Sequence, residues 1–151
     1  MKLKADSSEQ KLRGAYYTPL PLAEMMIDLF KDEPTISSVL EPSCGDGVFV
    51  EGLIKTGVNN KLKNVTAIEI ESEEAVILKE KTKQFQNIEV LNSDFVDYYQ
   101  DNNKNKRFDL ILGNPPYIRY QYLEEVQREV MSQILTSHGM KANKLVNTWV
   151  G

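Results

Sequence analysis

Apolar residues in this chain of 151 amino acids gather in short runs, and stripes at helical spacing lie between the runs. The runs predict four strands, at residues 38–41, 65–70, 88–91 and 108–112. The stripes predict helices after Thr18, after Gly47, at 73–85 and at 122–135, and the first helix carries Leu22, Met25, Met26, Leu29 and Phe30. Alternating strands and helices are typical of a parallel sheet with helices on both faces. The pattern therefore predicts an α/β fold.

The composition narrows the class of protein. The 18 Lys and Arg residues and 22 Asp and Glu residues give a formal net charge of −4, which argues against a self-sufficient nucleic-acid binder. The single cysteine, Cys44, excludes an intramolecular disulfide and a multi-cysteine metal site. No apolar run approaches the roughly 18–20 residues of a membrane span, and the amino terminus lacks the apolar core of a signal peptide. We expect a cytoplasmic protein without a metal, with a polar lead-in at residues 1–13.

The residues after each predicted strand carry the candidate chemistry, because ligands bind beyond the carboxyl ends of parallel strands. The first strand runs into Glu41-Pro42-Ser43-Cys44-Gly45-Asp46-Gly47, and a helix follows at once. Two glycines one residue apart let the backbone turn tightly and approach a ligand at the helix N-terminus. A dinucleotide fingerprint needs a third glycine where Val50 stands, which disfavours a nicotinamide cofactor. A tight turn without a ligand is the alternative.

Acidic residues follow the next two strands. Glu69 lies about 20 residues after the glycines, where a carboxylate commonly accepts hydrogen bonds from both hydroxyls of a ribose. The alternative for Glu69 is a solvated strand end. Asp94 and Phe95 follow the third strand, and this pair suits an adenine amino group and its ring. Asp94 can equally cap the short segment at 95–99, and the two roles are compatible.

The fourth strand ends in Gly113-Asn114-Pro115-Pro116-Tyr117. Two consecutive prolines fix φ, remove two N–H donors and hold the preceding residues extended. The result is a rigid loop that presents carbonyl oxygens and the Asn114 side chain, followed by an aromatic ring. Such a loop can accept two hydrogen bonds from a planar NH₂ group while Tyr117 stacks on the attached ring. A rigid turn without a ligand is the alternative.

The ordered motifs resemble a known family. Asn-Pro-Pro-Tyr after a strand, downstream of Glu-Pro-Ser-Cys-Gly-Asp-Gly, resembles the S-adenosylmethionine-dependent amino-methyltransferases. The segment Gly14-Ala15-Tyr16-Tyr17-Thr18-Pro19 resembles the amino-terminal cofactor motif of the gamma-class DNA adenine-N6 methyltransferases of restriction–modification systems. The resemblance spans roughly residues 11 to 120. It implies a Rossmann-like parallel sheet of the class I methyltransferase type, truncated to about four strands in the order 3-2-1-4.

The resemblance also implies a role for each motif residue. Around the methionine part of S-adenosylmethionine it places Thr18, Glu41, Ser43, Cys44 and Gly45, with Gly47 in the same loop. It implies that Glu69 holds the ribose, that Asp94 bonds the cofactor adenine, and that Ile70 and Phe95 pack on that ring. Asn114 and the carbonyl of Pro115 would accept hydrogen bonds from the target N6 amino group, with Pro116 in the same rigid loop. Tyr117 would stack on the target adenine, flipped out of duplex DNA.

Alternatives to a DNA adenine methyltransferase remain open at this point. Asn-Pro-Pro-Tyr also occurs in methyltransferases that act on release-factor glutamine or RNA guanine, although Tyr-Thr-Pro and Glu-Pro-Ser-Cys favour DNA adenine. We expect residues 14–151 to be the amino-terminal portion of a catalytic domain, without its later strands and recognition domain, and to have little activity alone. The other alternative is a non-catalytic cofactor-binding fragment that needs a partner chain. Duplex DNA would be bound through the full-length protein, and the fourth strand would be an exposed edge able to pair with another chain.

Overall fold

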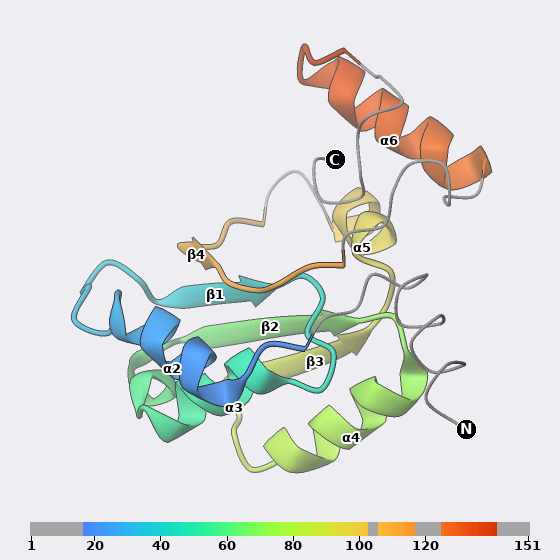
Figure 1. The fold of residues 1–151 in the computed structure, drawn as a ribbon. Helices are drawn as coiled ribbons and strands as arrows, with labels where there is room; N and C mark the ends of the chain where they lie inside the picture. Colours follow the sequence, from blue (N-terminus) through green and yellow to red (C-terminus); the bar gives the residue numbers. More distant parts are fainter. Residues whose placement is uncertain (1–16, 103–105, 117–124, 142–151) are drawn as a thin grey trace, which may run out of the picture. The chain divides into compact units, whose positions relative to one another are not determined.

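The computed structural model describes residues 17–102, 106–116 and 125–141. The chain divides into two compact units. Residues 17–114 form the first unit, and residues 1–16 and 115–151 form the second. The sheet and most of the predicted site residues belong to the first unit (Figure 1).

Four parallel strands form the sheet in the order β3-β2-β1-β4. Their bounds are Ser38–Glu41 for β1, Asn64–Glu69 for β2, Ile88–Asn92 for β3 and Leu110–Ile111 for β4. β1 pairs with β2 from Ser38 opposite Asn64 to Glu41 opposite Ala67, and its other side pairs with β4. The order confirms the predicted 3-2-1-4. Because the chain winds outward from β1 to β3 and then returns to the far side of β1, its winding direction reverses between β1 and β4, where such sheets bind ligands.

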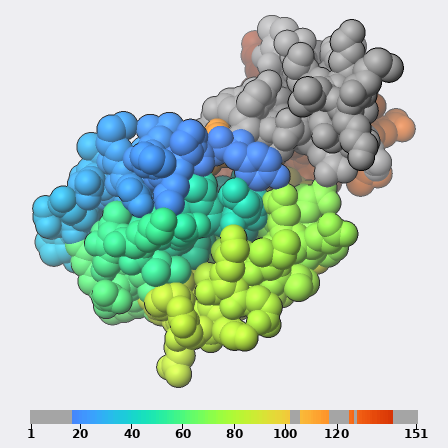
Figure 2. Space-filling model, turned by 60° about the horizontal axis from the view of Figure 1, so that its bottom comes forward, coloured from blue at the N-terminus to red at the C-terminus, as the bar shows by residue number. Residues whose placement is uncertain are grey.

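Helices cover both faces of this sheet (Figure 1). The helices α2 (Leu20–Asp28), α3 (Val48–Lys55) and α4 (Ser72–Thr82) share one face, which Figure 2 turns toward the reader. A short 3₁₀ helix, η1 (Val58–Lys61), connects α3 to β2, and α5 (Phe95–Asn102) lies on the opposite face. Val39 packs beneath the first group of helices, whereas Leu40 packs with Tyr98 of α5. Burial on both faces explains why β1 and β2 read as apolar runs, whereas β3 and β4 at the two edges are only partly buried.

The predicted apolar stripe of the first helix is only partly buried, because Met26 and Phe30 pack against the core and its other three residues do not. Leu22, Met25 and Leu29 are exposed, whereas Ala23 and Ile27 are fully buried. The reason lies on α3, where a Cβ added at Gly52 would come within 2.7 Å of Ile27 Cδ1. The missing side chain at this position lets α2 approach the backbone of α3.

Asp109 fastens the start of β4 to the start of β1. Its Oδ2 atom accepts hydrogen bonds from the backbone N–H and from the hydroxyl of both Ser37 and Ser38, at 2.8–3.0 Å. These hydrogen bonds favour the charged carboxylate and lower the pKa of Asp109 to about 2, and the bond from the Ser37 N–H contributes most. The strand predicted at 108–112 has complete parallel pairing only at Leu110–Ile111, although the Leu112 N–H still donates to the Leu40 carbonyl.

The second unit is described for residues 115–116 and 125–141. It contains α6 (Glu125–Ser137), on which Met131 and Leu135 are buried. The lead-in at 1–13 and the first residues of the helix predicted at 122–135 lie outside the described residues. None of the helices in the described parts of the chain combines the length and apolar character that crossing a membrane requires.

Candidate functional site

The loop after β1 turns on two glycines with left-handed backbone angles. Gly45 has φ 51°, and Gly47, the residue before α3, has φ 83°. The Gly47 N–H closes the turn on the Cys44 carbonyl at 2.8 Å, and the Cys44 N–H ties the loop to the Ile68 carbonyl of β2 at 2.9 Å. A Cβ at Gly47 would overlap Leu78 of α4. The predicted tight strand-to-helix turn is therefore present, and only glycine fits Gly47 without strain.

Glu69, the last residue of β2, holds this loop from the side. The carboxylate is 6% exposed, and its Oε2 accepts a hydrogen bond from the Gly45 N–H at 2.7 Å. Its Oε1 accepts from the N–H of Glu71 at 2.8 Å. Each carboxylate oxygen has two lone pairs, so both oxygens keep capacity for a further donor. Glu69 is thus a fixed acceptor beside the glycine loop, and the alternative of a solvated strand end is wrong because the side chain is buried.

Glu41 ends β1 as a buried carboxyl group. It is 2% exposed, and its Oε2 has no hydrogen-bond partner among the described residues. Burial, together with the negative charges of Asp46 and Glu69, raises the pKa of Glu41 well above its ordinary value. The Ser43 hydroxyl oxygen is likewise buried without a described partner. Buried polar atoms are normally paired, so these two mark a place where a ligand with donor groups fits.

Cys44 lies between Ser43 and Gly45 in the same loop. The side chain is buried, and burial, aided by the charges of Glu41 and Glu69, raises the pKa of its thiol. A thiol that stays protonated is a poor nucleophile. Cys44 therefore acts as a small apolar residue of the turn.

Asp94 and Phe95 begin α5 directly beyond β3. Asp94 Oδ1 accepts a hydrogen bond from the Val96 N–H at 2.7 Å, so the predicted capping role is confirmed. The cap involves one carboxylate oxygen. Phe95 is partly exposed, and Ile70, beyond the adjacent strand β2, is largely exposed. Two neighbouring strand ends thus carry apolar side chains at the surface.

Asn114 meets a residue from the other end of the first unit. Its Nδ2 donates to the Thr18 hydroxyl at 3.3 Å, across 96 positions of sequence. The neighbouring Gly113 lies against the first loop, because a Cβ there would be 3.6 Å from Pro42 Cδ and 3.7 Å from Glu41 Cγ. The ends of β1 and β4 thereby bring the glycine loop, Thr18 and Asn114 together.

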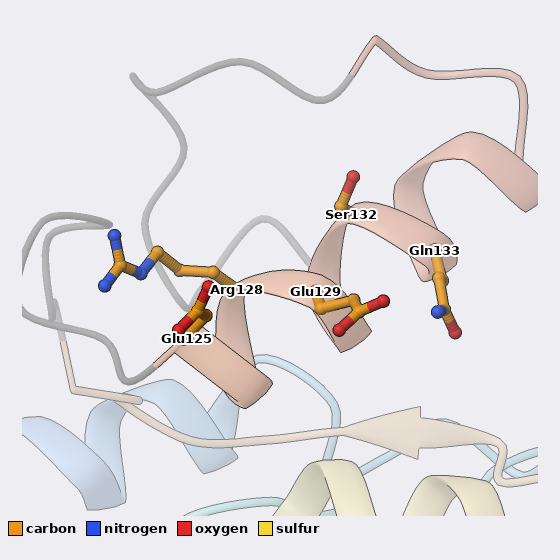
Figure 3. Close-up of a pocket in the computed structure, with 5 residues that line it drawn as sticks. All are labelled: Glu125, Arg128, Glu129, Ser132 and Gln133. Atoms are coloured by element: carbon orange, nitrogen blue, oxygen red, sulfur yellow. The ribbon is translucent and has the colours of Figure 1, made fainter.

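Of the other residues of the Asn-Pro-Pro-Tyr motif, Pro115 and Pro116 belong to the second unit, and Tyr117 lies outside the described residues. A separate pocket in the second unit is lined by charged and polar side chains of α6: Glu125, Arg128, Glu129, Ser132 and Gln133 (Figure 3). It contains none of the predicted site residues. Within the described ranges, no three His, Cys, Asp or Glu side chains are grouped to hold a metal ion.

Two side chains at the site were not identified by the motifs. Asn92 Nδ2, at the end of β3, donates to the carbonyls of Glu69 and Ile70 at 2.8 and 3.0 Å and so fixes the end of β2. Glu74 of α4 accepts a hydrogen bond from the Tyr17 hydroxyl at 2.8 Å. Both residues act through partners distant in sequence, so no local pattern marks them.

Comparison with known proteins establishes the family. The model of the Eco57I restriction-modification methylase family matches residues 23–147. This chain belongs to that family. The type II methyltransferase M.HincII of Haemophilus influenzae is 33% identical over 124 residues, which are 82% of this chain and 21% of that protein. M.AccI of Acinetobacter calcoaceticus is 29% identical over 147 residues, covering 97% of this chain and 26% of the relative. The chain therefore spans about a fifth to a quarter of the length of these curated methylases.

Solved structures agree on the fold. A type I restriction-modification methyltransferase subunit from Streptococcus thermophilus superposes with a TM-score of 0.55 at 19% identity, over 68% of this chain and 23% of that one. A dimethyladenosine transferase from Plasmodium falciparum gives 0.51 at 19% identity, over 84% and 40%. These likenesses show that this chain has the Rossmann-like sheet of the class I methyltransferases, and they confirm the predicted fold class.

Proposed function

We propose that this chain carries the cofactor-binding and amine-binding parts of an enzyme that transfers a methyl group from S-adenosylmethionine to N6 of adenine in duplex DNA. One observation carries the proposal. This chain belongs to a restriction-modification methylase family. Its glycine loop, anchored by Glu69, and its Thr18–Asn114 contact lie where the winding direction of the parallel sheet reverses. Transfer of a methyl group requires a site for the methyl donor beside a site for the methyl acceptor.

The described residues fit the cofactor. Its methionine part has an ammonium group and a sulfonium, both cationic, and the buried oxygens of Glu41 and Ser43 suit a ligand with donors and positive charge. Glu69 presents fixed acceptors for the ribose diol. Asp94 would accept from the adenine amino group, with Ile70 and Phe95 against its ring. When bound, the cofactor supplies a methyl group already activated by its sulfonium, so the protein mainly provides alignment.

Asn114 is proposed to bind the N6 amino group of the target adenine. The lone pair of an adenine N6 is delocalised into the ring and is a poor nucleophile. Two acceptors on its hydrogens, the Asn114 amide oxygen and the Pro115 carbonyl, stabilise the positive charge that develops on nitrogen in the transition state. The rigid Pro115-Pro116 segment orders these acceptors in advance, and Tyr117 would stack on the base.

We propose that DNA contacts come largely from sequence outside these 151 residues, since they span about a fifth to a quarter of the curated relatives. The net charge of −4 gives this chain no surplus of basic residues for phosphates. A target base inside a duplex cannot reach a strand-end loop, so the adenine must be flipped out. We therefore propose that the 151 residues bind the cofactor but methylate duplex DNA weakly or not at all by themselves.

The first experiment measures cofactor binding to this chain by calorimetric titration with S-adenosylmethionine. Glu69→Ala removes the acceptors for the ribose diol and should raise Kd at least about tenfold, since a hydrogen bond to a charged group contributes ~1.5–3 kcal/mol. Glu73→Gln, an exposed acidic residue in the first turn of α4, is the matched control and should bind as the wild type does. Equal affinities for the wild type and Glu69→Ala would contradict the ribose role.

The second experiment measures transfer by the full-length protein from radiolabelled cofactor to duplex DNA, followed by nucleoside analysis. Label is expected in N6-methyladenine. Asn114→Ala should abolish transfer and raise the cofactor Kd only a few-fold, because it removes the proposed amine contact together with one 3.3 Å hydrogen bond to the Thr18 hydroxyl. Label in N4-methylcytosine, or on a release-factor glutamine or RNA instead of DNA, would establish a different substrate. Robust methylation of DNA by the 151 residues alone would contradict the proposed need for the rest of the protein.

A further inference from the structure

A hydrogen bond between Tyr17 and Glu74 closes the outer side of the glycine loop. Tyr17 stands two residues before Pro19, the cap of α2, and Glu74 lies in the first turn of α4. The Tyr17 hydroxyl donates to Glu74 Oε1 at 2.8 Å across 57 positions of sequence. The bond thus joins the segment that leads into α2 to the helix that follows β2.

Gly45 lies beneath this pair. A Cβ built on Gly45 would be 3.5 Å from Glu74 Oε2 and 3.7 Å from Tyr17 Cε1. The N–H of the same glycine donates to Glu69 at 2.7 Å. Gly45 is therefore enclosed by Glu69 on its backbone side and by the Tyr17–Glu74 pair on its Cα side.

The residue after Tyr17 is Thr18, which contacts Asn114. The segment 17–18 is consequently anchored at two points, to α4 through the tyrosine hydroxyl and to the loop after β4 through the threonine hydroxyl. We propose that Tyr17 and Glu74 are positioning residues for the methyl donor, because their hydrogen bond holds segment 17–18 over the glycine loop. The inference rests on the proposed function, since it assigns these residues to the same cofactor site.

The pair acts through its hydrogen bond and not through charge alone. The hydrogen bond to Glu74 raises the pKa of Tyr17 to about 12. Burial and the negative charges of Glu74, Asp46 and Glu69 contribute less to this shift. The phenol therefore stays a neutral donor over the physiological range. Tyr17 is 51% exposed, so removing the hydroxyl should change global stability little. A loss of cofactor affinity can then be separated from unfolding.

The test is a double-mutant cycle on cofactor binding, with thermal unfolding as the folding control. Tyr17→Phe and Glu74→Ala should each raise Kd for S-adenosylmethionine about 3- to 10-fold, the range for one hydrogen bond. The double variant should be no weaker than the worse single variant. Glu74→Gln keeps a side-chain acceptor and should recover part of the affinity, whereas Glu73→Gln removes the neighbouring charge and should change Kd less than twofold.

Amide hydrogen exchange in the free protein supplies a measurement that needs no cofactor. The Gly45 N–H should exchange about 3- to 10-fold faster in Tyr17→Phe and Glu74→Ala than in Glu73→Gln or the wild type. If the wild type binds the cofactor but both single variants match Glu73→Gln in Kd, the positioning role is wrong and the proposed function stands. If the wild type fails to bind the cofactor, the proposed function is wrong and the positioning role falls with it, whatever the exchange rates.

Discussion

Replacing Gly47 with alanine should destabilise the first unit by two separable costs. The residue has φ 83°, and placing an L side chain in the left-handed region costs about 1–2 kcal/mol. The new Cβ would also overlap Leu78 Cδ1 and lie only 3.0 Å from its Cδ2. Leu78 is 2% exposed and cannot swing into solvent, so overpacking adds about 1–3 kcal/mol. The expected loss of roughly 2–5 kcal/mol is a large part of the ~5–15 kcal/mol that stabilises a typical domain.

Gly57 provides the matched control in the same unit. It has φ 75°, but the nearest atom to a Cβ there is Asn60 Nδ2 at 3.9 Å. Gly57→Ala should therefore lose only the conformational part, about 1–2 kcal/mol. Combining Gly47→Ala with Leu78→Ala removes the overlap, so the double variant should be more stable than the two single losses added together.

Urea unfolding followed by circular dichroism measures these free energies, provided that the slope of the transition is the same for all variants. Equal losses for the Gly47 and Gly57 variants would refute the overlap with Leu78. Strict additivity of Gly47→Ala and Leu78→Ala would refute it independently. A functional consequence follows as well, because the methyl at position 47 would displace the glycine loop and weaken cofactor binding beyond the effect on folding.

Two further predictions concern titration. Asp109 has a folded pKa of about 2, below its ordinary value, so its carboxylate stabilises the fold fully above about pH 4 and loses this contribution as the pH falls through about 2. Asp109→Asn should unfold at lower temperature than the wild type at pH 7, and the difference should shrink between pH 4 and pH 2; a constant difference would contradict the role of the two serine donors. Glu41 has a raised pKa, so a cationic methionine group beside it should release a proton on binding, and affinity should rise with pH. Titration in buffers of different ionisation enthalpy should show that release in the wild type and not in Glu41→Gln; heats independent of buffer in the wild type would contradict it.

The sequence predicted the two central strands well because β1 and β2 are buried on both faces, and such strands leave continuous apolar runs. It also located the glycine loop, Glu69 and Asn114, since each follows such a run directly. The complete burial of Ala23 and Ile27 on α2 could not be predicted, because it depends on the missing side chain at Gly52 of another helix.

The sequence also could not predict contacts between residues that are distant along the chain. Glu74 reads in the sequence as one of several acidic residues at a helix start, and only its distance to Tyr17 distinguishes it. Asn92 likewise gains its role from carbonyl groups on the neighbouring strand. Periodicity and motifs describe neighbours along the chain, whereas these residues act on neighbours in space.

The position of β4 at the end of the four-stranded sheet has a consequence for how this chain would unfold. The proposed cofactor residues follow β1, β2 and β3, whereas Asn114 follows β4, which pairs with β1 at two positions and is otherwise held by the hydrogen bonds of Asp109 and Leu112. Elements with few pairing bonds open at lower free energy than the core. As denaturant or acid increases, β4 should fray first, and the first species to accumulate would keep the proposed cofactor residues ordered while the proposed amine-binding amide of Asn114 is not.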